Sequence, residues 1–157
     1  MNSAVALAWK TFRLQPDLRE EIPQTPTAVF HFCDNEQDAN ECAELVVAGR
    51  KRATCCSLAE LETEGVALPK PGDWNVVTGW SGQPVAIIRT VQIEFLRFRE
   101  VTEEHAAMEG EGDGSLQYWR TAHEAYFRRV LTETQHQFHP DMQLAFEQFE
   151  LVQAIRA

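Results

Sequence analysis

The chain has 157 residues, of which 44% are hydrophobic and 24% charged, and its formal net charge is −10. This length predicts one globular domain with a sizeable core. The acidic balance argues against a protein that grips duplex DNA by its phosphates, because such proteins present a broad Lys and Arg surface. Only Arg50, Lys51 and Arg52 form a tight basic cluster, which favours a nucleoside, a nucleotide or a short strand as any nucleic-acid ligand.

The start of the chain and the cysteines bear on location and redox state. The apolar stretch Ala4 to Trp9 has six residues and no cationic segment before it, too short for a signal peptide or a membrane span. We therefore expect a cytoplasmic protein that does not enter a membrane. The four cysteines lack the paired C-x-x-C spacing of a structural zinc site. This predicts reduced thiols, with the adjacent Cys55 and Cys56 as small core residues.

The N-terminal part is predicted to hold a helix and then a strand. From Ser3 to Leu14 apolar residues recur every three or four positions, typical of an amphipathic helix that covers part of the core. Prolines then break the pattern, and the β-branched and aromatic content of Ala28 to Phe32 predicts a first strand.

A second helix is expected to begin after Asp34 or Asn35, which are good N-caps, and to end at Gly49 in the left-handed conformation. The chain then turns at Lys51 and enters an extended stretch near Thr54. Residues on such a rigid corner are well placed to form a site.

The middle of the chain predicts a short helix followed by the sheet core. Ser57 to Glu60 has the spacing of a capping box, with Leu58 and Leu61 on the expected buried side and Gly65 at the end. Strand-like sequence begins at Asp73. It continues, after a hairpin turn at residues 79–82, through apolar residues mostly at period two as far as Phe95.

The C-terminal third is predicted to hold two helices and a strand. Thr102 caps a short helix that ends near Met108, and a glycine-rich acidic loop, residues 109–114, leads into the longest helix. The inward stripe of that helix is Leu116, Trp119, His123, Tyr126, Phe127 and Val130. A last strand covers Met142 to Val152, and a slip in its alternation around Glu147 suggests a bulge.

Several motifs in order resemble those of one family. Gly49, Lys51 and Thr54 fit the pattern G-x-K-x-x-T, which is the signature of the ASCH domain. The supporting segments are PKPGD from Pro69, VTEEHA from Val101, EGEGD from Glu109, Trp119 with His123, and FEQFELV from Phe146. The resemblance spans roughly residues 28–152. It divides the chain into an N-terminal helix with a proline-rich connection, 1–27, and an ASCH domain, 28–157.

The resemblance implies an α+β fold, a small PUA-like β-barrel with surrounding helices and a cleft associated with RNA or modified nucleosides. One bacterial branch hydrolyses the amide of 4-acetylcytidine without a cofactor, and its catalytic triad falls by position on Lys51, Thr54 and Glu109. Another branch is described as a metal-dependent ribonuclease acting on single strands. The predicted function is therefore an amidohydrolase acting on acylated, cytidine-like nucleosides, and the alternative is a ribonuclease or a non-catalytic RNA-binding module.

Amide hydrolysis needs a nucleophile, a base and an acid that protonates the leaving amine. In one hypothesis burial disfavours the charge on Lys51, so that it accepts the Thr54 proton while Glu109 passes a proton to the exocyclic nitrogen. In the other, Glu109 activates a water and Thr54 positions the carbonyl. Without the resemblance, Lys51 is an ordinary cation at a helix C-terminus and Thr54 an ordinary strand residue.

Four further residues are candidates for substrate binding, each with a plainer interpretation. Glu111, with Glu109 and Asp113, belongs either to a hard-cation site or to a solvated loop that caps the next helix, and we expect no metal. His123 and Trp119 are either core residues or ligand contacts, the indole by stacking on a base. Arg52 is either simply exposed or a base or phosphate contact.

Overall fold

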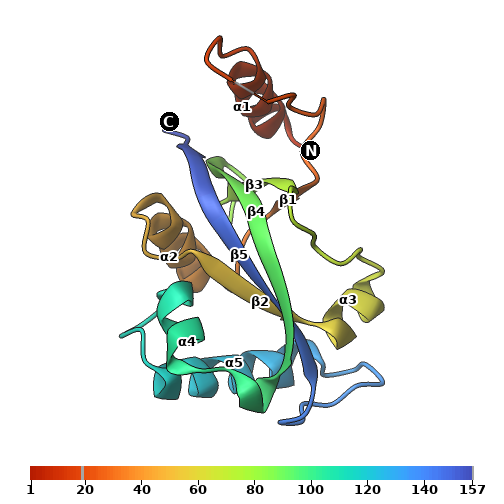
Figure 1. Ribbon diagram of the computed structural model, residues 1–157. Helices are drawn as coiled ribbons and strands as arrows, with labels where there is room; N and C mark the ends of the chain where they lie inside the picture. The colour runs from red at the N-terminus through yellow and green to blue at the C-terminus, as the bar shows by residue number, and fades with distance from the viewer. Residues whose placement is uncertain (19, 157) are drawn as a thin grey trace.

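In the computed structural model, which describes residues 1–18 and 20–156, five strands form one curled sheet with helices around it (Figure 1). The strands are β1 (Ala28–Phe30), β2 (Ala53–Ser57), β3 (Trp74–Thr78), β4 (Pro84–Arg97) and β5 (Gln143–Ala154). The helices are α1 (Ser3–Arg13), α2 (Glu36–Val47), α3 (Leu58–Glu64), α4 (Glu103–Glu109) and α5 (Leu116–Val130), with a short 3-10 turn, η1 (Phe98–Glu100).

The strand order in the sheet is β1-β3-β4-β5-β2. Strand β1 pairs with β3 in parallel, and the other neighbouring pairs are antiparallel. The sheet curls into a half-barrel, and within the described residues β1 and β2 are its two edges. The predicted α+β class with a barrel-like sheet and surrounding helices is therefore confirmed.

The predicted helix ends are found because their capping residues act as expected. The side chain of Asn35 accepts the backbone N–H of Asp38 at the start of α2, and Gly49 lies just past its end with φ +75°. Ser57 and Glu60 form the capping box of α3. These caps fix where α2 ends and β2 begins, and thereby position the corner between them.

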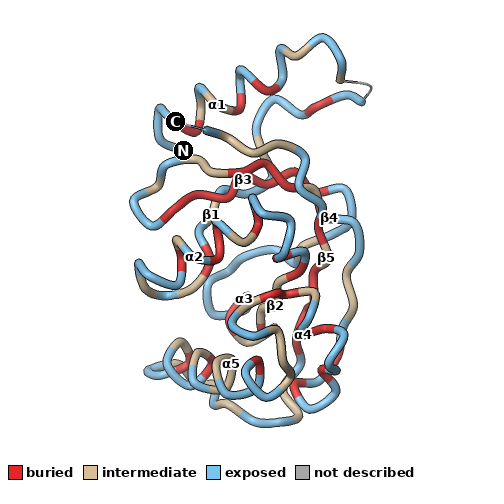
Figure 2. The backbone as a smooth tube through the Cα atoms, turned by 90° about the vertical axis from the view of Figure 1, so that its left-hand side faces the viewer, coloured by how far each residue is buried: buried red, intermediate tan, exposed pale blue. Residues whose placement is uncertain are grey.

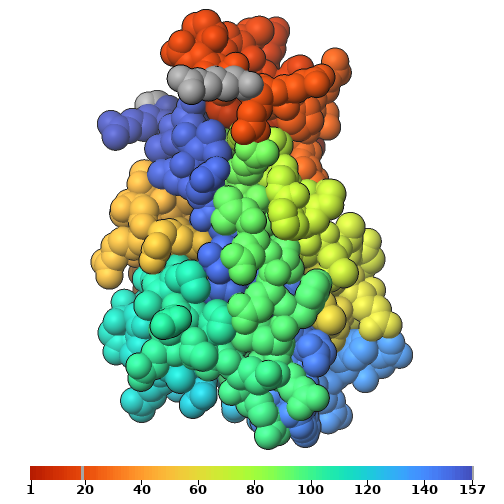
Figure 3. Space-filling model, in the orientation of Figure 1, coloured from red at the N-terminus to blue at the C-terminus, as the bar shows by residue number. Residues whose placement is uncertain are grey.

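Three apolar clusters surround the sheet. One lies under α1, where Val5, Trp9 and Phe12 pack against the outer face of β3 and β4. A second joins α2 to the inner face, and the third joins α4 and α5 to the lower parts of β4 and β5. Figure 2 shows the buried residues gathered along the strands, and Figure 3 shows the N-terminal segment capping one end of the molecule.

One local prediction is right only in part, and another is wrong. The predicted irregularity near Glu147 exists, but the extra residue lies in β4: the register shifts between Thr90 and Gln92, which pair with Phe149 and Gln148, while Glu147 itself pairs with Thr54 and Ile93. The alternation of β5 slips because both of its faces are covered at residues 144–147. In α3 the buried residue is Glu60, which accepts the hydroxyl of Tyr126 at 3.0 Å, whereas the leucines are only half-buried.

As for membranes, the described part of the chain contains no helix with the length and apolar character that a span requires.

Candidate active site

The corner after α2 is fixed by backbone hydrogen bonds from both sides. The N–H groups of Arg50 and Lys51 donate to the carbonyl of Leu45 at 2.9 and 3.1 Å, and the N–H of Arg52 donates to the carbonyl of Met108 at 2.8 Å. Gly110 lies so close that a Cβ on it would come within 2.4 Å of the Arg50 carbonyl oxygen. Only glycine fits this approach, which brings the end of α4 against the corner.

Lys51 and Glu109 form a buried ion pair at this corner. Their side chains are each 1% exposed, and the Lys51 Nζ lies 3.4 Å from the Glu109 Oε1. The same ammonium donates to the carbonyl of Ala53 at 2.9 Å and lies 5.0 Å from the centre of the Phe32 ring. Two residues 58 positions apart in the chain are thus brought into contact.

The carboxylate of Glu109 has partners on both oxygens. The indole N–H of Trp119 donates to Oε2, and the His123 Nε2 lies 3.5 Å from Oε1. The His123 ring stacks on Trp119 with centroids 4.1 Å apart, and its Nδ1 lies 2.9 Å from the Trp119 carbonyl. These two α5 residues therefore hold the Glu109 carboxylate in one orientation.

The pKa values of the group follow from these contacts. Burial opposes a charge on Glu109, but His123 and Lys51 outweigh it and lower the pKa of Glu109 to about 2. Burial also opposes a charge on Lys51, but the carboxylates of Glu109 and Glu111 outweigh it and raise the Lys51 pKa above its ordinary value. The same carboxylates raise the pKa of His123 against the effect of its burial.

These directions correct one of the two sequence-based hypotheses. Lys51 is a cation at neutral pH, so it cannot act as the neutral base that accepts the Thr54 proton. Burial does act as expected, but the carboxylates beside the ammonium reverse the sign of the shift. The resting site therefore holds an anion at Glu109 and a cation at Lys51.

A pocket of about 850 Å³ opens beside this pair. Lys51, Thr54, Glu109, Glu111 and His123 all line it. Thr54 is half-buried on β2, in register with Glu147 on β5, so the two side chains lie on the same face of the sheet. The three predicted catalytic residues thus share one cavity of a size that suits a small ligand.

Two predicted binding residues lie elsewhere. Arg52 is exposed and lines a second hollow of about 450 Å³ with Gly110 and Asp113. Trp119 is 2% exposed, and its ring packs on Phe98 and His123 beneath the Glu109 carboxylate. The structure does not bring Arg52 to the Lys51 pocket and leaves Trp119 no open face for a base.

The acidic loop divides into parts with different environments. Glu111 has a side chain 18% exposed, and its oxygens lie 3.8 Å from the Lys51 Nζ and 3.9 Å from the His123 Nε2. Asp113 faces solvent and accepts the N–H of Ser115, which in turn caps α5. The interpretation of a capped helix start therefore holds for Asp113 and Ser115, whereas Glu111 belongs to the pocket.

The structure adds pocket residues that the sequence patterns did not single out. Asn75 on β3 is 4% exposed, lines the pocket, and has no hydrogen-bond partner for its Oδ1 within the described residues. Two groups also have the spacing of metal ligands, Cys55 with Glu109 and His123, and Cys33 with Cys42 and Glu111. In the sequence, the only sign that Asn75 could belong to a site is its polar side chain in the middle of a strand pattern.

Comparison with known proteins identifies the family. The family model described as the ASCH domain matches residues 28–153. The chain belongs to the ASCH domain family. This family is proposed to bind RNA or to act on it. Helix α1 precedes the matched region. In a separate comparison, no curated protein matches the chain.

Solved structures resemble the chain along most of its length. An ASCH domain from Lactobacillus crispatus JV V101 is 38% identical, with a TM-score of 0.76 over 80% of this chain and 79% of that one. A protein from Enterococcus faecalis V583 is 35% identical, with a TM-score of 0.85 over 98% of this chain and 91% of that one. A hypothetical protein at 16% identity and a TM-score of 0.51 shows likeness of fold alone.

Proposed function

We propose that this ASCH protein is an amidohydrolase that removes the acyl group from the exocyclic amine of a cytidine-like nucleoside such as 4-acetylcytidine. The observation that supports it best is the buried Lys51–Glu109 pair at the wall of a nucleoside-sized pocket. Buried charges are costly unless they are paired, and perturbed ionisable groups in a cleft are typical of catalytic sites. The net charge of −10 also favours a small substrate over a long polyanion.

Hydrolysis of the amide requires one proton to leave a water and one to reach the departing amine. In our proposal the Glu109 carboxylate accepts the proton of the water, whose oxygen forms the new bond to the acyl carbon. The Lys51 ammonium donates its proton to the exocyclic nitrogen as the carbon–nitrogen bond breaks. The proton then returns from Glu109 to Lys51 across their 3.4 Å contact, which restores the starting pair.

The low pKa of Glu109 makes it a weak base in the empty pocket. His123 and, after it, Lys51 lower this pKa, so a substrate that takes over hydrogen bonds of Lys51 weakens one of the two interactions and makes the carboxylate more basic. The pKa of His123 is raised by Glu109 and Glu111, which favours its protonated form, and in that form its ring provides positive charge close to the developing oxyanion.

The remaining pocket residues suit recognition. The Thr54 hydroxyl is assigned to the acyl carbonyl, to which it donates a hydrogen bond. The Oδ1 of Asn75, which has no hydrogen-bond partner in the described part of the chain, is assigned to an N–H donor of the ligand, because a buried acceptor left without a partner is unfavourable. The Oε2 of Glu111, which lies 3.9 Å from the His123 Nε2, is assigned to the substrate.

Ultraviolet absorbance during incubation with 4-acetylcytidine, in buffer containing EDTA, tests the proposal. We expect release of cytidine and acetate, both identified by mass spectrometry. Single-stranded RNA is incubated in parallel with and without magnesium or manganese. Cleavage of RNA that requires the added metal, with no cytidine released from the nucleoside, would support the ribonuclease alternative and reject the amidohydrolase.

A further inference from the structure

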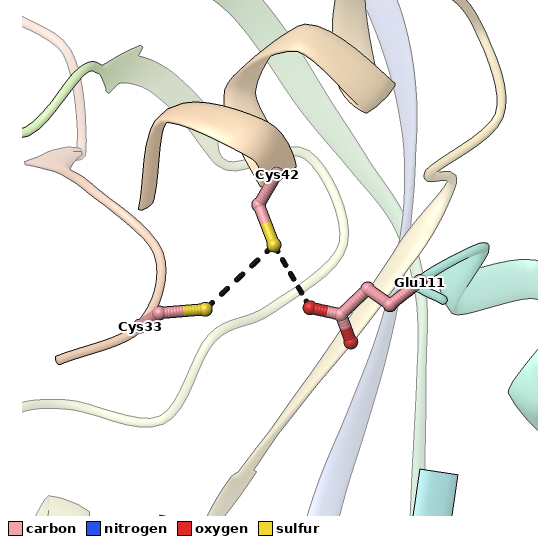
Figure 4. Close-up of side chains that lie close together, drawn as sticks. All are labelled: Cys33, Cys42 and Glu111. Carbon is pink, nitrogen blue, oxygen red and sulfur yellow. Dashed lines mark hydrogen bonds between the residues drawn. The ribbon is translucent and has the colours of Figure 1, made fainter. Parts of the chain in front are cut away.

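Two cysteines nine positions apart meet in the wall of the pocket. Cys33 follows β1, and Cys42 lies on α2 with its Sγ 3.7 Å from that of Cys33. The thiol of Cys42 also donates to the Glu111 Oε1 at 2.8 Å, so three side chains from three segments converge (Figure 4). All three residues line the pocket.

The spacing of these atoms matches that of zinc ligands. Zinc bound tetrahedrally at about 2.3 Å from each thiolate places two sulfurs about 3.8 Å apart, and the observed separation is 3.7 Å. The three ligand atoms lie within 4.8 Å of one another. The Glu111 oxygen, at 2.8 Å from the Cys42 Sγ, must move away from that sulfur by less than about 1 Å.

We propose that Cys33, Cys42 and Glu111 form a binding site for a thiophilic divalent cation, with Zn²⁺ as the natural ligand and the fourth position open to the pocket. The site goes beyond the proposed hydrolase and needs no hydrolytic activity. It also departs from the expectation of no metal, which rested on sequence spacing alone.

The charges around the site suit this ion. Two thiolates and one carboxylate carry three negative charges, so the zinc-bound group has a net charge of −1. Lys51 lies 3.8 Å from one Glu111 oxygen, and His123 lies 3.9 Å from the other. The Lys51 ammonium offsets the remaining negative charge of the zinc-bound group.

The second ligand-like group is less suited to an ion. Cys55, Glu109 and His123 lie close together, but Glu109 already accepts from Trp119 and faces Lys51 at 3.4 Å. A cation there has to compete for a Glu109 oxygen with the indole at Oε2 or with the Lys51 ammonium at Oε1. A disulfide between Cys33 and Cys42 is distinct from the observed thiol contact, because the two sulfurs would have to approach from 3.7 Å to about 2.05 Å.

Cobalt titration tests the site directly. The protein is kept in a non-thiol reductant, stripped of metal, and titrated with Co²⁺ while thiolate-to-cobalt charge-transfer absorption is recorded, and Zn²⁺ is then added to displace the cobalt. We expect one ion per chain. We expect Cys33→Ser and Cys42→Ser to weaken Zn²⁺ binding by at least about 100-fold, more than the usual loss of an outer-shell contact.

Two further variants test whether a loss of binding comes from the loss of a ligand rather than from a disturbed fold. Cys33 has φ +63°, a backbone conformation that suits glycine, so Cys33→Gly removes the ligand without straining the fold. Cys56→Ser is the matched control, because Cys56 also lines the pocket but belongs to neither ligand group. It should bind as the wild type does.

Three results would overturn the site. One is absence of thiolate-to-cobalt absorption in the reduced wild-type protein. Another is binding that survives in the two Cys33 variants and in Cys42→Ser. The third is loss of binding in Cys55→Ser alone, which would place the ion at the Glu109 group. Because these readouts involve no substrate, they stand apart from success or failure of the hydrolase assay.

Discussion

The α1 end of the molecule and the pocket bury side chains of opposite character. Under α1 the packed side chains are apolar, with Trp9 against Phe12 and Phe12 against Trp74. At the pocket the equally buried side chains are Lys51 and Glu109, which are ionised. Apolar burial stabilises a fold directly, whereas buried charges rarely do so better than a well-packed apolar pair. We infer that the first region serves stability and the second serves chemistry.

The largest expected effect is on catalysis at the pocket. Replacing Lys51 with Met removes the proposed proton donor, and we expect kcat on 4-acetylcytidine to fall by about 10³-fold or more. The exposed Lys10 on α1 provides the control, since Lys10→Met should leave the rate unchanged.

Lys51→Met also removes the positive charge that pairs with the buried Glu109 carboxylate, which should lower the free energy of unfolding by about 3–5 kcal/mol. A partly unfolded variant would also be slow, so the rate of Lys51→Met alone does not separate catalysis from stability. Lys51→Arg separates the two effects. It keeps the cation and should retain more of the stability, but a guanidinium does not give up its proton and the rate should stay low. Recovery of the rate in Lys51→Arg would show that only charge is needed.

The apolar end should show the reverse pattern. Trp9 is 2% exposed, and Trp9→Ala should lower the free energy of unfolding by about 3–5 kcal/mol. The rate per folded molecule should not change. Urea denaturation measures the first quantity, and the nucleoside assay at a temperature where the variant is folded measures the second.

Much of the fold was predictable because it depends on local signals. Asn35, Ser57 and Gly49 set helix ends through contacts within a few residues. The period-two pattern likewise located β4. The pattern failed in β5 at residues 144–147, where both faces are covered, so alternation of apolar and polar residues does not show to which face each side chain points.

The site was only partly predictable because its parts meet through the curl of the sheet. The resemblance pointed to Lys51, Thr54 and Glu109, but no local pattern shows that Lys51 lies within 3.4 Å of Glu109. For the same reason the charge of Lys51 was open until its neighbours were known. The contact between the thiols of Cys33 and Cys42 depends on how the segment after β1 lies against α2, and spacing rules for paired cysteines do not detect it.

Acid should weaken the pocket more than the apolar end. The pKa of Glu109 is about 2 in the folded protein, below its ordinary value of 4.5. A depressed pKa adds stability above the ordinary value, and this stability is lost as the pH falls from 4.5 through about 2. In Glu109→Gln the loss over that range should be smaller than in the wild type. Denaturation at a series of pH values measures the difference, and identical slopes would contradict the assigned charge.

The smallest effect is expected at Asn75. Asn75→Leu removes the acceptor assigned to the ligand, and we expect KM to rise by about tenfold, the value of one hydrogen bond. Its Oδ1 has no partner among the described residues, so the variant should unfold at the same temperature as the wild type or higher. An unchanged KM would remove Asn75 from the binding site.

The most direct test of the central claim is a double-mutant cycle on hydrolysis of 4-acetylcytidine with Lys51→Met, Glu109→Gln and the two combined. Residues that act as one catalytic unit show strongly non-additive losses. We predict that the double variant is no slower than the slower single variant. A folded wild-type protein that releases no cytidine, or losses that multiply in the double variant, would contradict a catalytic Lys51–Glu109 pair.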